Sequence, residues 1–310
     1  MQNLCGVDIS KDWLDSFIGP DHFERFENSP EGISKLADFV QAHGGPLVVM
    51  EASGGLERVP FYMLWEHKIP CAIVNARSVR DFARAMGRLE KTDQIDAYVL
   101  AKFGAAMDVK PMPAPSLNQR RLSALSARMR QVVSDLSIQK QRLHTAHIDV
   151  AQSGILELIA MLKNQSKSLS AEIARLIDAD PLWAAIDATL RSVKGVADRT
   201  VATLMAELPE LGILSNKAIA KLAGLAPLAD DSGKRQGYRR TRGGRSHVRT
   251  ILFLVADIAR KYDQSLTAFR QRLIDQGKPK MVIRIALAHK LLVRLNAKTR
   301  ETRLKFANQS

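Results

Sequence analysis

Four acidic side chains are placed where they could act together on a phosphodiester bond. Asp8 lies within an apolar, strand-like stretch, and Glu51 ends a second apolar run. Asp93 and Asp96 are three residues apart, which puts both on one face of a helix. Carboxylates gathered at the strand ends of one sheet repel each other unless a cation lies between them, and Mg²⁺ prefers oxygen ligands. We therefore predict that these four residues form a catalytic magnesium site, in which two ions flank the scissile phosphate.

Each of these acids also has a simpler interpretation. Asp96 could merely lie on a helix surface, and Asp93 could cap a helix that starts after Thr92. The combination favours the metal site, because an unpaired charge at Asp8, inside an apolar strand, is costly. Taken singly, the acids would not carry the prediction.

A second candidate for chemistry is Ser232, which lies in a segment crowded with cations. Arginines that neutralise phosphate make attack by a hydroxyl on phosphorus more feasible. A Ser-Gly pair is also an ordinary turn sequence, and Tyr238, flanked by arginines, would also suit covalent attack on DNA. From the residues alone these alternatives stay open. We predict that nucleic-acid backbone binds the cations of the C-terminal part, namely Lys194, Lys234, Arg235, Arg239, Arg240, Arg242, Arg245 and Arg249.

The other reactive residue types form no convincing site. His144 and His147 are three residues apart but have no evident third ligand, and His247 is expected to contact phosphate or cap the next helix. Ser53, beside Glu51, is expected to be structural. There is no Walker loop, dinucleotide fingerprint or zinc-finger spacing, so we expect neither a nucleotide cofactor nor zinc.

The distribution of charge predicts a polyanionic partner. The formal net charge is +14, and residues 231–310 hold 20 lysines and arginines against five acidic residues, so the remainder is close to neutral. Such concentration favours nucleic acid, since no basic stretch carries the apolar stripe of a membrane-surface helix. With no apolar run that could cross a bilayer, no signal segment and only Cys5 and Cys71, we expect a reduced, cytoplasmic location.

The elements that must position the acids follow from the apolar patterns of residues 1–110. Three short antiparallel strands are predicted over 4–9, 13–18 and 22–26. After them come a helix from Ser29-Pro30, a buried strand over 47–51, a helix over 56–68, a strand over 71–75 and further helices. A meander extended by crossover units is the layout of a ribonuclease-H-like mixed sheet, so we predict an α/β domain of that kind.

The pattern changes after the proline-rich linker 110–115. Apolar residues step by threes and fours over 122–143 and again over 155–176, on either side of Ser153-Gly154. This spacing predicts two helices that fold back on each other as an antiparallel coiled coil, which we assign to residues 116–180. Either helix could instead pack on another subunit.

Residues 183–310 are predicted to form a basic, mainly helical domain. A helix over 200–208 follows Gly195, and Ser215 caps another helix that ends at 224–227. Helix, tight turn and helix around Gly195 resemble a helix-hairpin-helix, whose turn amides can hold a DNA phosphate. Ala197 stands where the second glycine is usual, which leaves that phosphate contact open.

Motifs along nearly the whole chain resemble those of one family. Residues 6–11 (GVDISK), 51–55 (EASGG) and 91–97 (KTDQIDA) look like the three acidic motifs of the DEDD transposases of bacterial insertion sequences. The C-terminal half resembles that family's transposase domain in Gly195-Val196, residues 222–227 (LAGLAP), Ser232-Gly233, and residues 242–244 (RGG) with Arg249. Each motif is weak alone, but their order and spacing are specific.

The resemblance implies more than the residues do. The N-terminal domain is expected to be similar to the RuvC Holliday-junction resolvase. Members of the family move their element without target duplication and form a covalent serine–DNA bond, and Ser232 matches that serine. They use a structured guide RNA that pairs with target and donor DNA, and RuvC-like and serine domains of different subunits form a composite site. We therefore expect a nucleoid-associated bacterial recombinase that acts as a dimer or tetramer joined by the coiled coil.

Two other functions stay open. A hydrolytic junction resolvase would use the four carboxylates alone and leave no covalent intermediate. A scaffold for RNA or DNA would keep its function without any of the acids. Covalent protein–DNA adducts would distinguish the recombinase from both.

Overall fold

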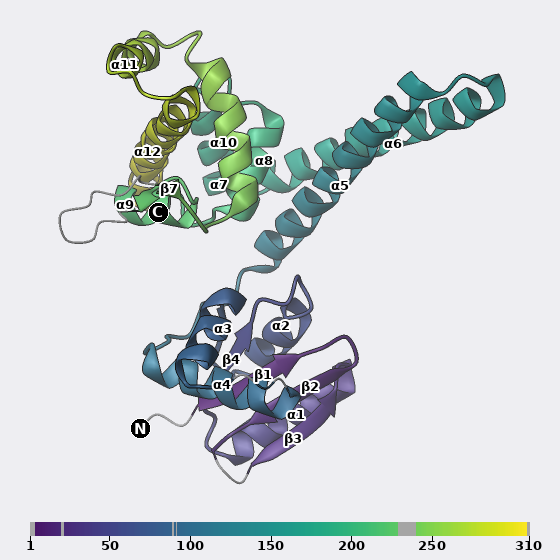
Figure 1. Cartoon of the computed structure of the whole chain (residues 1–310), viewed down its shortest axis with the longest axis vertical. Coiled ribbons are helices and arrows are strands. Elements are labelled where there is room, and N and C mark those ends of the chain that lie inside the picture. The colour runs from purple at the N-terminus through teal and green to yellow at the C-terminus, as the bar shows by residue number, and fades with distance from the viewer. Residues whose placement is uncertain (1–3, 20–21, 89, 91, 229–239, 309–310) are drawn as a thin grey trace. The chain divides into compact units, whose positions relative to one another are not determined.

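The computed structural model describes residues 4–19, 22–88, 90, 92–228 and 240–308. The chain divides into two compact units, Met1–Pro115 and Ser116–Ser310 (Figure 1). Within the described residues, no helix has both the length and the apolar character needed to span a membrane. The first unit is mixed α/β, and the second is mostly helical.

The N-terminal unit is built on a five-stranded sheet of order β3-β2-β1-β4-β5, counted over the described residues. Its strands are β1 (Leu4–Ile9), β2 (Trp13–Phe17), β3 (Phe23–Glu27), β4 (Leu47–Glu51) and β5 (Cys71–Val74). β1, β2 and β3 pair antiparallel, whereas β4 is parallel to both of its neighbours, β1 and β5. The sequence placed each strand to within one residue at either end.

Helices cover both faces of this sheet. They are α1 (Pro30–Ala42), α2 (Arg58–Glu66), α3 (Ala76–Ala85) and α4 (Asp93–Ala106). α1 begins where expected, because the Ser29 side chain accepts a hydrogen bond from the Gly32 amide and Pro30 occupies the first turn. Leu36 and Leu64 of α1 and α2 pack with Val7 on one face. Val79 and Leu100 of α3 and α4 pack with Val49 on the other.

The C-terminal unit begins with two long helices, α5 (Leu117–Thr145) and α6 (Asp149–Asp178), which pack along each other. The chain reverses at residues 146–148, where Ala146 and Ile148 are extended. The turn expected at Ser153-Gly154 was therefore wrong, because both residues lie inside α6. A glycine costs a helix about 1 kcal/mol, which the packing of α6 against α5 overrides here.

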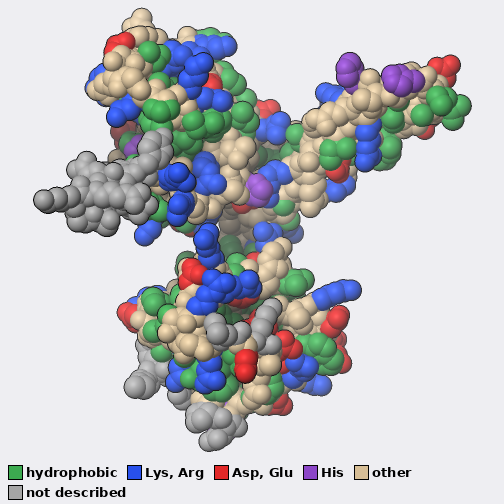
Figure 2. All heavy atoms as spheres, viewed as in Figure 1, with side chains coloured by type: hydrophobic (Ala, Val, Ile, Leu, Met, Phe, Trp, Pro, Cys, Tyr) green, Lys and Arg blue, Asp and Glu red, His purple; other side chains and the backbone are tan. Residues whose placement is uncertain are grey.

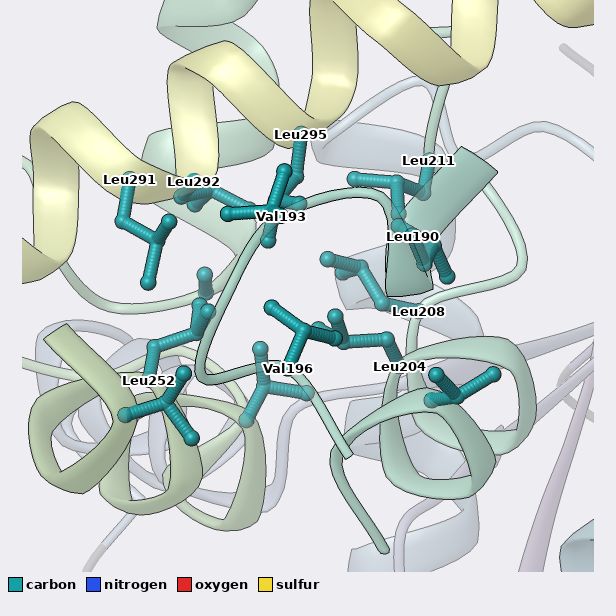
Figure 3. Packing of buried hydrophobic residues seen from close by; sticks show 14 of the residues in the cluster. Leu190, Val193, Val196, Leu204, Leu208, Leu211, Leu252, Leu291, Leu292 and Leu295 are labelled. Carbon is teal, nitrogen blue, oxygen red and sulfur yellow. The ribbon is translucent and has the colours of Figure 1, made fainter. Parts of the chain in front are cut away.

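The rest of this unit surrounds one large core. Its elements are α7 (Pro181–Arg191), α8 (Asp198–Glu207), α9 (Asn216–Leu222), β6 (Pro227–Leu228), β7 (Arg240–Thr241), α10 (Ser246–Ala259), α11 (Gln264–Asp275) and α12 (Lys280–Ala307). Figure 3 shows Val193 and Val196 of the α7–α8 turn inserted among leucines from several of these helices. Leu122 of α5 and Ile177 of α6 belong to the same core, so the long helices are anchored in it.

Candidate active site

Asp8 and Glu51 reach the same edge of the sheet because β1 and β4 are parallel neighbours. Val7 lies opposite Met50, so Asp8 and Glu51 follow one residue further along their strands. Val7 and Met50 point into the core beneath α1 and α2. Since side chains alternate along a strand, the two acids face the other side of the sheet, towards α3 and α4.

Close packing of α4 against β1 brings the other two acids to this edge. A Cβ atom on Gly6 would lie 2.0 Å from the Ala97 carbonyl oxygen, so only glycine permits the approach. α4 begins at Asp93, and the Thr92 hydroxyl accepts a hydrogen bond from the Ile95 amide at 3.2 Å. Thr92 is therefore the cap, and Asp93 and Asp96 occupy the first turn of α4. Negative charge is favourable there.

Three of the predicted acids line one cavity of about 340 Å³. Asp8, Glu51 and Asp96 contribute its acidic part, together with Glu90. Burial, and then the charges of Asp96, Glu51 and Asp93 in that order, together raise the pKa of Asp8 to about 6. The other three acids found in the sequence thus act electrostatically on Asp8, although the four come from three separate elements.

Asp93 is held differently from the other three. Its carboxylate accepts a hydrogen bond from Arg25 Nη2 at 2.7 Å. The same guanidinium binds Asp15, with Arg25 Nε 2.8 Å from one carboxylate oxygen. Asp15 is buried and lies directly opposite Asp8 in the β1–β2 pairing. Arg25 therefore neutralises a fifth carboxylate at this edge and keeps Asp93 at its rim.

The acids suit a divalent metal ion by their chemistry. Asp8, Glu51 and Asp96 are oxygen ligands on one cavity, and a cation would relieve the repulsion that raises the pKa of Asp8. In the described part of the chain, no three histidine, cysteine or acidic side chains are grouped closely enough to enclose an ion. The residues that would hold a metal are therefore identified, and their side chains would have to draw together around it.

Sequence reasoning missed the arginines that share the acid cavity. Arg80, Arg84 and Arg88 line it together with the carboxylates. Arg80 and Arg84 are four residues apart on one face of α3, which was the signal available in the sequence, and Arg88 follows the end of that helix. Figure 2 shows Lys and Arg side chains on both units, so basic surface is not confined to the C-terminal segment.

Ser232, Tyr238, Lys234, Arg235 and Arg239 lie outside the described residues. The two ends of their segment are paired, because Leu228 of β6 lies opposite Arg240 of β7.

Two turns that contain glycines, one before β6 and one after β7 in the sequence, contact each other next to the β6–β7 hairpin. Gly224 and Gly244 both have φ of +67°, and a Cβ on Gly244 would lie 2.2 Å from the Gly224 amide nitrogen. Arg249 Nη1 donates to the Gly243 carbonyl at 2.6 Å. The Arg245 amide donates to the Leu222 carbonyl at 2.8 Å. The LAGLAP and RGG motifs, far apart in sequence, therefore form one rigid junction that we call the glycine clamp (Gly224, Gly243, Gly244, Arg245 and Arg249).

The predicted phosphate-binding cations differ in their surroundings. The Arg245 guanidinium is half-buried and forms two bonds to the Glu210 carboxylate, at 2.5 and 2.7 Å. Arg240, Arg242 and Lys194 are exposed. Gly195, next to Lys194, has φ of +97°, and its Cβ would lie 3.1 Å from the Ala259 amide nitrogen, so packing on α10 requires a glycine there.

The remaining candidates have simple structural explanations. The Ser53 hydroxyl donates to the Glu51 carbonyl at 3.1 Å, which agrees with a structural role. His144 and His147 are exposed near the α5–α6 turn. His247 lies in the first turn of α10, whose cap position is Arg245 and whose first amides receive no side-chain cap. Cys5 and Cys71 are buried free thiols.

Comparison with known proteins finds the same two regions. A model for the DEDD domain of IS110 transposases matches residues 5–149, and a model for transposases of the IS116/IS110/IS902 family matches residues 187–271. Pilin gene-inverting proteins of Moraxella bovis and Moraxella lacunata are each 27% identical over 314 residues, covering 97% of both chains. A 43.6 kDa protein of insertion element IS110 from Streptomyces coelicolor is 27% identical over 159 residues, which are 51% of this chain and 38% of that protein.

The acidic motifs on the sheet edge and these matches define an enzyme that recombines DNA, a transposase. Its DEDD domain implies dependence on a divalent metal ion. More particularly, residues 5–149 and 187–271 are each similar to models of the IS110 family of transposases.

Proposed function

We propose that this transposase cuts and rejoins DNA through a covalent bond to Ser232, with Mg²⁺ held by Asp8, Glu51, Asp93 and Asp96. The observation that carries the metal site is that Asp8, Glu51 and Asp96, from three separate elements, line one cavity. Burial, and then the charges of three acids from β4 and α4, raise the pKa of Asp8, although none of these acids is close to Asp8 in sequence. Such shared repulsion is typical of a site that works with a bound cation, and it is hard to explain for acids of an ordinary surface.

The residues around the acid cavity have distinct tasks in this mechanism. A bound Mg²⁺ would supply charge neutralisation at the scissile phosphate. Arg80, Arg84 and Arg88 would hold the DNA backbone at the mouth of the same cavity, since arginine binds phosphate through paired donors. Arg25 would fix Asp93 until the backbone is bound.

Ser232 would act as the nucleophile. Its Oγ loses a proton and forms a bond to phosphorus, while the bond from phosphorus to the departing strand's oxygen breaks and that oxygen takes up a proton. A hydroxyl of the second strand then attacks the phosphoserine and releases Ser232, so one phosphodiester replaces another without an external energy source. The glycine clamp supports this assignment because it fixes both ends of the segment that carries Ser232.

The finer features of the fold belong to the same proposal. The sheet order supports a ribonuclease-H-like, RuvC-like domain over residues 1–110. We assign residues 116–180 to a coiled coil that joins subunits into a dimer or tetramer. Residues 183–310 form the transposase domain, in which the α7–α8 turn acts as a helix-hairpin-helix with Lys194 near phosphate. A composite site would combine the acid cavity of one subunit with Ser232 of another.

The partners follow from this mechanism. We expect target and donor DNA, a structured guide RNA that pairs with both, and a place of action at the bacterial nucleoid in the cytoplasm. Arg240, Arg242 and Arg249, with Lys234, Arg235 and Arg239, would bind the backbone of these nucleic acids, while Arg245 would support them through Glu210. Affinity should therefore fall steeply with salt.

Trapping of covalent adducts tests the proposal. The protein is incubated with labelled DNA from both ends of its own element, RNA transcribed from that element and Mg²⁺, and then denatured. Wild type and Tyr238→Phe should give a protein–DNA band, whereas Ser232→Ala and Asp8→Ala should not. A Ser232→Ala protein that still forms the adduct would show that Ser232 is not the nucleophile. Loss of the adduct in Tyr238→Phe alone would identify the tyrosine as the nucleophile.

One alternative has an observation of its own. The acid cavity and its arginines lie entirely within the N-terminal unit, as a hydrolytic RuvC-like nuclease would require. Such an enzyme would leave cut DNA without any adduct. In the same gel it would give Mg²⁺-dependent fragments that persist in Ser232→Ala and vanish in Asp8→Ala.

A further inference from the structure

A second large cavity opens in the C-terminal unit between α11, α12 and the β6–β7 hairpin. Its volume is about 700 Å³, within the range of about 300–1,000 Å³ usual for sites of small organic ligands. Its walls are mainly apolar, with Phe269 from α11 and Val282 and Ile285 from α12. It shares no lining residue with the acid cavity.

The charged side chains that line this cavity are all basic in the described part of the chain. They are Arg240 of β7, Arg272 of α11 and Lys290 of α12. Thr241 and His289 add groups that can donate or accept hydrogen bonds. Burial lowers the pKa of His289, so its ring is neutral near pH 7. The cavity therefore combines apolar walls, neutral polar groups and a positive rim.

Phe269 links the apolar and the charged parts. Arg272 Cζ lies 5.2 Å from the centre of its ring, and Lys290 Nζ lies 4.4 Å from it. An aromatic ring flanked by cations is the arrangement by which proteins hold single-stranded nucleic acid, with the base stacked on the ring and the phosphate on the cations.

Other occupants fit less well. A lipid chain or an apolar protein segment would cover Arg240, Arg272 and Lys290 without supplying a counter-charge, which is costly. A base-paired duplex keeps its bases stacked inside and could reach only the rim. An unpaired nucleotide offers a flat apolar face, polar edges and a negative charge together.

We propose that this cavity binds one unpaired nucleotide of a DNA or RNA strand, with its base against Phe269 and its phosphate on Arg240 and Arg272. The inference rests on the proposed function, because β7 follows directly on the segment that carries Ser232. A nucleotide held here would fix the strand beside the hairpin whose ends the glycine clamp braces.

Oligonucleotide binding by the full chain tests this site. Fluorescence anisotropy is measured with labelled single-stranded octamers of DNA and of RNA and with the corresponding DNA duplex, and unlabelled dAMP serves as a competitor. Ala286→Trp fills the cavity and Phe269→Ala removes the stacking ring. Each should weaken single-strand binding about tenfold while changing duplex binding less than twofold. Comparison of DNA, RNA and dAMP identifies the source of the nucleotide.

Matched variants separate the site from general effects. Phe269→Tyr keeps a ring and should restore binding. Arg272→Ala should weaken single-strand binding severalfold, whereas Arg270→Ala, on the same helix but outside the cavity lining, should not. A 5-iodouracil octamer should cross-link to Phe269 or its neighbours on irradiation. This cross-link does not depend on any variant being folded.

Two results would overturn the proposal. One is unchanged single-strand binding by a folded Ala286→Trp protein, with no cross-link at the cavity. The other is a change in sedimentation in place of a change in binding, which would make the occupant a second copy of the chain. Octamer binding involves no covalent step, so a failure of the covalent mechanism would be seen in the adduct gel alone.

Discussion

The acid cavity and the glycine clamp position chemistry in opposite ways. In the N-terminal unit, regular strands and a helix bury Asp8 and bring like charges close to it, and both effects raise its pKa. In the C-terminal unit, irregular turns are locked by backbone contacts, and the half-buried Arg245 is neutralised by Glu210. The acids of the first region therefore lower its stability, whereas the motif glycines and arginines of the glycine clamp stabilise the second region.

The largest effect is expected from Gly6→Ala. The new Cβ would lie 2.0 Å from the Ala97 carbonyl oxygen and 2.6 Å from the Ala101 amide, so α4 must move away from β1. We expect a loss of about 3 kcal/mol or more, measured by urea unfolding, and loss of DNA cleavage because Asp96 moves as well. Retention of both stability and cleavage would show that the approach of helix to strand is not what positions the acids.

Gly244→Ala should be the most damaging change in the glycine clamp. Gly243 and Gly244 both have φ of +67°, but only a Cβ on Gly244 meets other atoms, with the Gly224 nitrogen at 2.2 Å. Gly243→Ala should cost about 1–2 kcal/mol from the backbone conformation alone. Gly244→Ala should cost clearly more and abolish adduct formation. Equal losses in thermal unfolding of the two variants would mean that the contact between the turns is unimportant.

The arginines of the acid cavity should affect DNA binding and leave stability nearly unchanged. Arg84→Ala should weaken binding severalfold at low salt and reduce the slope of log affinity against log salt by about one. Arg77→Ala is the control, because Arg77 is exposed on the same helix but does not line the cavity. Similar slopes in the two variants would mean that DNA binding depends on overall positive charge and not on the arginines of the cavity.

A smaller effect on stability is expected from Asp8→Asn, which removes the charge of Asp8 from the acid cavity. Without metal, Asp8→Asn should stabilise the protein at pH 8 by on the order of 1 kcal/mol, because burial and then repulsion by the neighbouring acids disfavour the ionised Asp8. Wild type should gain relative stability as the pH falls through about 6, where folded Asp8 takes up a proton that the unfolded chain binds only near 3.8. The difference between the two proteins should therefore shrink at pH 5.

Added Mg²⁺ provides the complementary test of that variant. It should raise the thermal midpoint of wild type more than that of Asp8→Asn. An equal gain in both would argue against a metal at this site.

The smallest effect is expected at Gly154. It lies within α6, and a Cβ there would meet nothing within 4 Å. Gly154→Ala should stabilise the chain by about 0.5–1 kcal/mol in urea unfolding. A loss of stability would instead favour the boundary between two helices that the sequence suggested at this position. The same substitution is a control for Gly6→Ala, because it adds a methyl group without a clash.

Local pattern predicted the elements around Asp8 and Glu51, since a strand has a period that places its acids on one face. It did not predict the position of the α5–α6 turn, because the contacts that keep α6 helical at Gly154 are made with another helix, α5. Asp15 was missed for a similar reason. Its position opposite Asp8 and its bonds to Arg25 depend on strand pairing and do not show in its own stretch of sequence. Nor could the partner of Arg245 be found, because Glu210 lies 35 residues away.

The contact between Gly6 and α4 has a consequence for how the acids move. No side chain separates strand from helix at this point, so no change of rotamer can widen or narrow the gap. The approach of the strand that carries Asp8 to the helix that carries Asp96 is set here by backbone against backbone, in a close-packed interior. Metal affinity at this edge should accordingly depend little on how the surrounding core is repacked.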